Sequence, residues 1–187
     1  VDVSERAVIL WFAKIRSVII NSVERSGDDP IGGPGKIVEI DETSLSKKRK
    51  HNVGRVVPQH WFFGGIERGT NRWFGQSVPN RSRETLIPIL ERMVKPGTLI
   101  ISDQWSAYTR GDFNLSTVQE KNWSHLTVNH STNFVDPNSG AHTQTIEGRW
   151  GHLKKKIKNM NGCSSNILPE YTKIEMWKSR VVLSQKS

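Results

Sequence analysis

Two kinds of residue pattern are missing from this sequence, and each absence excludes a class of protein. The 187 residues include a single cysteine, Cys163, which excludes an internal disulfide and a zinc site built from several cysteines. No run approaches the roughly 20 apolar residues of a membrane-spanning helix. The longest apolar-rich stretch, from Val8 to Ile20, is interrupted by charged residues, and no secretory signal precedes it. We therefore expect a protein of a reducing compartment.

Positive charge is what the chain has in excess. Its 27 lysines and arginines outnumber its 18 acidic residues, which gives a formal net charge of +9. Basic side chains displace condensed counterions from phosphates, so this surplus favours a polyanionic partner such as nucleic acid. Charge alone does not separate a nucleic-acid-binding protein from a merely basic one.

The spacing of apolar residues predicts one α/β domain with a mixed sheet. A helix is expected over residues 4–24 with Ser4 as its N-cap, followed by a glycine- and proline-rich break. The break divides a helical lead-in, residues 1–30, from a main domain, residues 31–187. Because the chain starts with valine, we interpret the lead-in as the end of a truncated N-terminal region. Strands are expected over residues 36–41, 61–67, 72–78, 98–102 and 126–129. Further helices are expected over residues 82–94, 145–158 and 169–183.

Three acidic residues occupy positions from which their carboxylates can meet. Asp41 ends the first predicted strand, and Asp103 directly follows the strand over residues 98–102. If these strands are parallel neighbours, both carboxylates lie at one edge of the sheet. Glu147 flanks the apolar stripe of the helix over residues 145–158, so that helix can direct it toward the same edge. The stripe consists of Ile146, Trp150, Leu153 and Ile157.

Converging carboxylates point to a divalent metal site. They repel one another, and hard oxygen ligands without cysteine or clustered histidine select Mg²⁺ or Mn²⁺ over zinc. Two such ions ~4 Å apart can activate a water or a 3′ hydroxyl and stabilise the leaving oxygen of a phosphodiester. Lys154, two turns beyond Glu147, is predicted to contact a phosphate or position the nucleophile. With 18 acidic residues in the chain, spacing alone does not establish such a site.

The residues around the three acids form a series of ordered motifs. They read IGGPGKIVEIDET from Ile31, KKRK from Lys47, NVGR from Asn52, WFFGGIERG from Trp61, IISDQWSAY from Ile100, TVNHSTNFVDP from Thr127 and GAHTQTIEGRWGHLK from Gly140. The series covers roughly residues 31–158. It resembles the DDE transposases of the Merlin DNA transposons and their bacterial insertion-sequence relatives.

The resemblance implies a ribonuclease-H-like mixed sheet flanked by helices, and cut-and-paste transposition by hydrolysis followed by strand transfer. It also implies that Asp41, Asp103 and Glu147 bind two Mg²⁺ or Mn²⁺ ions, with Lys154 as a further catalytic residue. The partners would be DNA, as transposon ends and target, and further copies of the chain in a homo-oligomer. The location would be the nucleus in a eukaryotic source, and otherwise the cytoplasm or nucleoid.

The sequence departs from the family pattern in two respects. The interval from Asp103 to Glu147 is longer than usual, and we interpret the additional residues, 111–123, as a surface loop. The N-terminal DNA-binding region of a full transposase is absent. His130 and His142 fall inside family motifs and are candidates to line the cleft, whereas Trp105 is expected to pack beneath the site.

The densest basic run, residues 46–51, lies just beyond Asp41. Contact with the DNA backbone is the interpretation we favour; a solvated loop and a nuclear import signal are the alternatives. The residues expected to contact DNA are Lys47, Lys48, Arg49, Lys50, Arg55, Lys154 and Lys158. Two other functions stay open at this point: a domesticated DNA-binding protein that does not cut, and a nuclease or resolvase that stops at hydrolysis.

Overall fold

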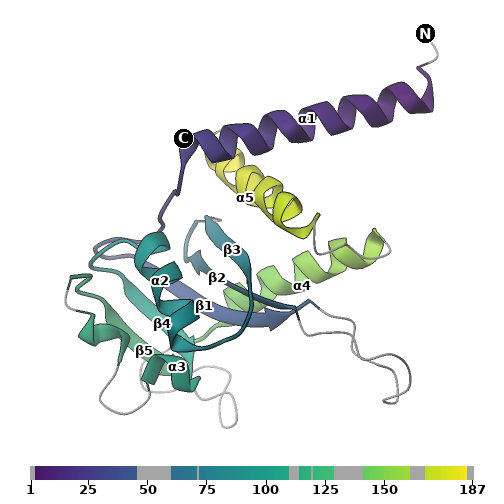
Figure 1. Ribbon diagram of the computed structural model, residues 1–187. Helices are drawn as coiled ribbons and strands as arrows, with labels where there is room; N and C mark the ends of the chain where they lie inside the picture. The colour runs from purple at the N-terminus through teal and green to yellow at the C-terminus, as the bar shows by residue number, and fades with distance from the viewer. Residues whose placement is uncertain are drawn as a thin grey trace, which may run out of the picture.

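The elements of the fold follow the predicted order. The computed structural model describes residues 3–45, 60–70, 72–109, 114–118, 120–128, 141–160 and 167–184. The strands are β1 (Ile37–Ser44), β2 (Trp61–Glu67), β3 (Trp73–Val78), β4 (Leu99–Asp103) and β5 (Ser124–Val128). The helices are α1 (Glu5–Ser26), α2 (Arg83–Met93), α3 (Ser106–Thr109), α4 (Gln144–Asn159) and α5 (Leu168–Ser184), with a 3₁₀ turn, η2, at Leu115–Thr117 (Figure 1).

The five strands form one mixed sheet in the order β3-β2-β1-β4-β5. The first three are antiparallel neighbours, and β1, β4 and β5 run parallel. The strands that carry Asp41 and Asp103 are thus parallel neighbours, which is the condition under which both carboxylates lie at one edge of the sheet. Asp41 does not end β1, however: the strand continues to Ser44, because β2 pairs with it along its whole length, from Val38 opposite Glu67 to Ser44 opposite Trp61.

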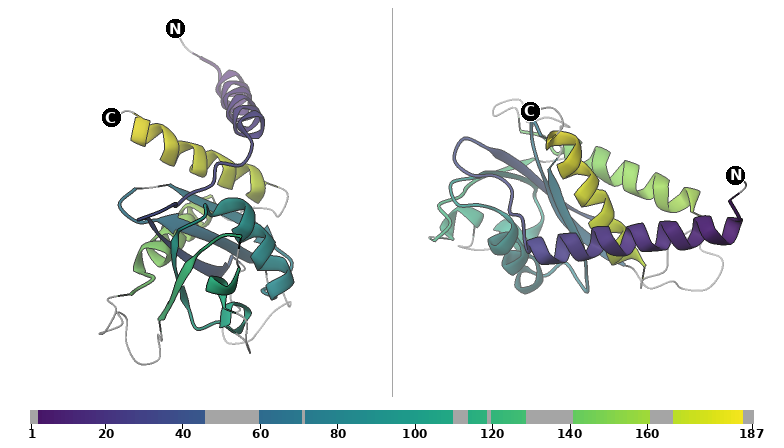
Figure 2. Two further views of the ribbon diagram at one scale, coloured as in Figure 1. Left: turned by 90° about the vertical axis from the view of Figure 1, so that its left-hand side faces the viewer. Right: turned by 90° about the horizontal axis from the view of Figure 1, so that it is seen from above.

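Helices cover both faces of the sheet, with α4 on one face and α2 and α3 on the other (Figure 2). Alternate residues of β1 point to opposite faces. Glu39 and Asp41 contact α4, whereas Glu42 contacts Tyr108 of α3. A mixed sheet sandwiched in this way is the ribonuclease-H-like architecture that the resemblance implied.

Helix α1 begins as predicted but does not pack as its pattern suggested. Ser4 accepts a hydrogen bond from the Ala7 amide and so caps the helix. The helix then projects from the rest of the chain (Figure 1). Trp11 and Phe12 of its apolar stripe are 63% and 58% exposed. Helix α1 contacts α5. No helix in the described ranges is long and apolar enough to cross a membrane.

Part of the segment interpreted as a surface loop belongs to the core, so that interpretation was wrong. Leu115, in the 3₁₀ turn, is completely buried, and Trp123 is only 3% exposed. The Trp123 indole N–H donates to the carbonyl of Lys95, which ties the segment to the end of α2. Isolated apolar residues without helical or strand periodicity gave no indication of this burial.

The packing of α4 on the sheet depends on a glycine in β2. Gly64 lies opposite Asp41, and a Cβ atom there would lie 2.2 Å from the carbonyl oxygen of Phe74 and 2.8 Å from the Trp150 ring. Trp150 packs edge-on against Phe62, with ring centroids 5.5 Å apart. The missing side chain therefore lets the indole approach the strand.

We expect Gly64→Ala to destabilise the fold by at least about 2 kcal/mol, because a backbone carbonyl cannot move aside as a flexible side chain can. Gly151→Ala is the matched control: it lies in α4 with no atom within 4 Å of an added Cβ. It should stabilise the helix by about 0.5–1 kcal/mol. Urea unfolding of both variants measures the difference, and equal free energies of unfolding would contradict this account of the packing.

Candidate metal centre

Asp41 and Asp103 occupy matching positions on neighbouring parallel strands. The last paired residues of β1 and β4 are Glu39 and Ile101. Asp41 and Asp103 each lie two residues farther along, where β4 ends while β1 continues beside β2. Two carboxylates from separate parts of the chain are thus brought to one edge of the sheet.

The environment of Asp41 raises the pKa of its carboxyl group to about 8. The largest cause is burial, and the negative charges of Glu42, Asp103 and Glu147 raise the pKa further. A hydrogen bond from the Glu42 backbone opposes them. The Trp150 indole N–H also donates to Asp41 Oδ2, at 3.0 Å. Both other members of the predicted triad therefore act electrostatically on Asp41.

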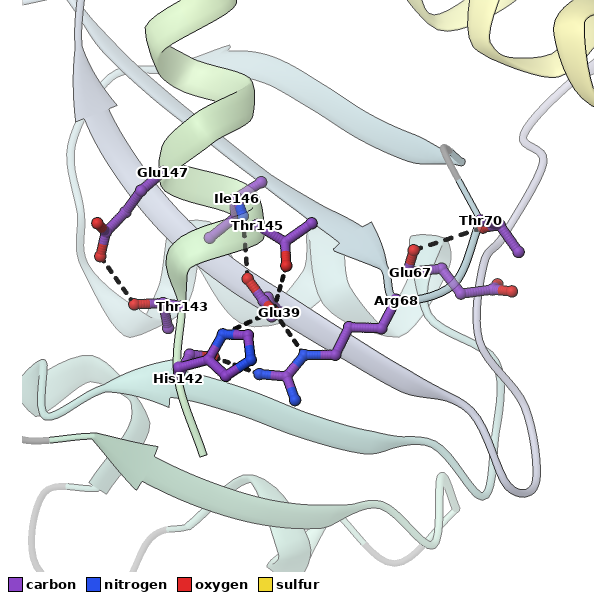
Figure 3. Close-up of polar contacts among 9 residues, drawn as sticks. All are labelled: Glu39, Glu67, Arg68, Thr70, His142, Thr143, Thr145, Ile146 and Glu147. Carbon is purple, nitrogen blue, oxygen red and sulfur yellow. Dashed lines mark hydrogen bonds and ion pairs between the residues drawn. The ribbon is translucent and has the colours of Figure 1, made fainter. Parts of the chain in front are cut away.

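The other two carboxylates are each held by a hydrogen bond. The amide of Trp105 donates to Asp103 Oδ1 at 2.9 Å, so the turn after β4 fixes this side chain. Glu147, in the first turn of α4, accepts a hydrogen bond at 2.9 Å from the hydroxyl of Thr143, the N-cap residue (Figure 3). Glu147 is exposed, whereas Asp41 and Asp103 are half-buried.

Glu39 anchors the helix that carries Glu147, and the sequence analysis did not identify it. Its side chain is fully buried, yet it accepts from the Ile146 amide at 2.9 Å and from the Thr145 hydroxyl at 2.7 Å. Arg68 contributes an ion pair of 2.5 Å, and its Nη2 also donates to the carbonyl of His142 (Figure 3). A carboxylate at the N-terminus of a helix satisfies unpaired amides there and interacts favourably with the helix dipole. A charged residue between Val38 and Ile40 was the available signal.

A half-buried carboxylate lies on the opposite face of β1. Glu42 accepts a hydrogen bond from the hydroxyl of Tyr108, which is completely buried. Burial raises the pKa of Glu42 to about 7; the Tyr108 hydrogen bond and the charge of Arg81 lower it, and the charge of Asp103 raises it. This pair joins α3 to the strand that carries Asp41.

The other predicted site residues lie on α4, beside Asp103 and Thr143, or outside the described residues. Lys154 and Lys158 are exposed on α4. The run from Lys47 to Lys50, together with Arg55 and His130, lies outside the described residues, but Leu45 and His60, which flank the run, are joined by a backbone hydrogen bond of 3.0 Å. His142 and Trp105 are half-buried, and Trp105 packs against Arg81. Within the described ranges, no three histidine, cysteine or acidic side chains lie close enough together to hold a metal ion.

Comparison with known families identifies the domain. The profile of the ISXO2-like transposase domain matches residues 28–179, which is most of the chain. The chain belongs to the ISXO2-like transposase family. This agrees with the expected insertion-sequence type of transposase.

Individual proteins are more distant. An uncharacterised transposase-like protein of Haemophilus influenzae is 28% identical over 101 residues, covering 54% of this chain and 75% of its own length. Among solved structures, the catalytic core of BIV integrase is 12% identical with a TM-score of 0.48, covering 73% of this chain and 79% of its own. A chain of the simian T-cell lymphotropic virus intasome, solved with PP2A regulatory subunit B56 gamma, is 15% identical with a TM-score of 0.46, covering 74% of this transposase domain and 47% of its own length.

Because Glu39 anchors α4, replacing it should lower the stability of the fold considerably. We expect Glu39→Ala to lower the free energy of unfolding by about 3 kcal/mol, because Arg68 and the first turn of α4 lose their buried partner. Amide hydrogen exchange at Ile146 should accelerate at the same time. The control is Glu24→Ala, which breaks an exposed ion pair with Lys173 and should cost less than about 1 kcal/mol. Equal effects of the two substitutions would show that Glu39 does not anchor α4.

Proposed function

We propose that this transposase domain is the catalytic domain of a DDE transposase, which hydrolyses a DNA strand and then transfers the new 3′ end into target DNA. The observation that carries the proposal is the matching placement of Asp41 and Asp103 on neighbouring parallel strands. The hydrogen bonds that Glu39 accepts from Thr145 and Ile146, at the start of α4, support Glu147 as the third member. Membership of the family supports DNA as the substrate.

We propose that Asp41, Asp103 and Glu147 would together hold two Mg²⁺ or Mn²⁺ ions, and that their side chains draw closer when the ions bind, because no three such side chains among the described residues already lie close enough to hold an ion. All three offer hard carboxylate oxygens, and the negative charges that raise the pKa of Asp41 are of the kind that divalent cations compensate. When bound, such ions polarise a phosphodiester and lower the pKa of the attacking water or hydroxyl.

The chain itself orients these ligands. Trp150 donates to Asp41, the Trp105 amide donates to Asp103, and Thr143 donates to Glu147. Donors of this kind fix the direction of a metal-binding carboxylate and tune its basicity. The proposed site is therefore supported by α4 on one side and by the turn after β4 on the other.

The basic residues supply a path for DNA. We propose that Lys47, Lys48, Arg49, Lys50 and Arg55 contact the DNA backbone, since the flanking Leu45 and His60 lie where β1 ends and β2 begins. Lys154 and Lys158 extend the positive surface along α4, and Lys154 contacts a phosphate near the reacting bond. We further propose that the domain is related to Merlin transposases, on the motifs quoted above, and that it acts as a homo-oligomer.

The mechanism predicts that Asp103→Ala abolishes Mg²⁺- or Mn²⁺-dependent DNA cleavage and joining while DNA binding survives. Loss of a metal ligand affects catalysis far more than it affects contacts with the DNA backbone. Glu170→Ala, which removes an exposed carboxylate at the start of α5, is the control and should keep full activity. Unchanged activity in Asp103→Ala would rule out the mechanism.

A substrate with a pre-cut 3′ end tests joining directly: cleavage without joining would favour a nuclease or resolvase.

Replacing Lys47, Lys48, Arg49 and Lys50 together with alanine should weaken DNA binding about equally for unrelated sequences. Phosphate contacts supply affinity without reading bases, and each one lost should flatten the plot of log affinity against log salt by about one unit. Fluorescence anisotropy with two unrelated duplexes measures both quantities. If affinity and slope are unchanged, the run does not contact DNA; if affinity falls for one sequence only, the run reads bases.

A further inference from the structure

The sheet edge that carries Asp41 and Asp103 also gathers two tryptophans and an arginine. Trp61 is the first residue of β2 and lies opposite both Ser44, the last residue of β1, and Val78, the last residue of β3. Arg81 follows three residues after β3 ends, and Trp105 follows two residues after β4 ends. Three separate segments therefore meet where the proposed metal ligands lie.

The three side chains form a stack with the guanidinium in the middle. The Arg81 guanidinium carbon lies 3.8 Å from the centre of the Trp61 ring and 4.0 Å from that of the Trp105 ring. Trp105 is itself fixed, because its indole N–H donates to the Arg81 carbonyl at 3.0 Å and its amide donates to Asp103. A cation held between two indole faces is attracted to both rings and loses its rotamer freedom before any ligand arrives.

The N–H groups at the edge of the Arg81 guanidinium are available to donate hydrogen bonds to a ligand. Its N–H donors all lie in the plane of the group, and the two rings cover only its faces. None of the residues that the structure describes accepts a hydrogen bond from it. Arg81 borders an open hollow of about 700 Å³, which Ser82, Arg83, Ser106 and one acidic residue, Glu84, also line. Arg83 Nε donates to the carbonyl of Ala107, so its side chain forms part of the wall.

We propose that Arg81 binds a phosphate of the DNA strand that enters the proposed metal centre, donating two parallel N–H groups to its non-bridging oxygens. Guanidinium and phosphate match in shape and charge, and a bidentate pair fixes orientation as well as affinity. Because Trp105 links Arg81 to Asp103, the bound phosphate is positioned relative to the carboxylates. The inference rests on the proposed function for the identity of its ligand, a DNA strand.

The test compares Arg81→Gln with Arg92→Gln, a control at the opposite end of α2 whose side chain pairs with Asp28. Binding of a 5′-fluorescein-labelled duplex is measured by anisotropy across a range of NaCl concentrations. Loss of one phosphate contact should weaken binding several-fold and flatten the salt slope by about 0.9 in Arg81→Gln only. An unchanged slope, or one that equals that of Arg92→Gln, overturns the proposal and assigns Arg81 to balancing the nearby carboxylates.

A second variant keeps the test valid if Arg81→Gln melts at a lower temperature than the unsubstituted chain. Arg81→Lys retains the positive charge but has no planar fork, so it should keep the salt slope and lose part of the affinity. Full affinity in Arg81→Lys contradicts bidentate binding. The cleavage assay with Asp103→Ala is independent of these measurements: activity that persists there refutes the proposed mechanism and leaves the Arg81 result to be judged on binding alone.

Discussion

A carboxylate that is shielded from water must be matched by donors, and in this chain that requirement joins the sheet to α4. Glu39 obtains its partners from Arg68 and from the first turn of the helix, at Thr145 and Ile146. These contacts fix where α4 starts. The position of Trp150 on the sheet, and through it the hydrogen bond to Asp41, follows from that starting point.

Much of the architecture could be predicted from local patterns. Alternating or continuous apolar residues marked all five strands, and the apolar stripe of α4 is buried at Ile146, Trp150 and Leu153. The pairing of β1 with β4 entered the sequence analysis only as a condition, because apolar periodicity does not show which strands are neighbours. The motifs around Asp41 and Asp103 indicated the family, because they combine strand residues with polar residues that packing alone does not require.

The parts that escaped prediction depend on contacts between distant segments. Glu39 could be recognised as a charge in an apolar strand, but two of its partners, Thr145 and Ile146, lie more than a hundred positions along the chain. The burial of Leu115 and Trp123 arises from packing against α2 and the sheet, which no local periodicity encodes. For helix α1 the local pattern was sufficient to predict the helix. The pattern does not show, however, whether another element packs against the apolar stripe.

Because Glu39 fixes where α4 starts, the position of Glu147 does not depend on how many residues connect β5 to α4. In general, each doubling in the length of a flexible loop costs only about 0.6 kcal/mol of closure entropy. The spacing inside β1 has no such latitude: one residue inserted between Glu39 and Asp41 would turn one of these side chains to the opposite face. An insertion between β5 and α4 should therefore displace Glu147 less than an insertion inside β1 would displace Asp41.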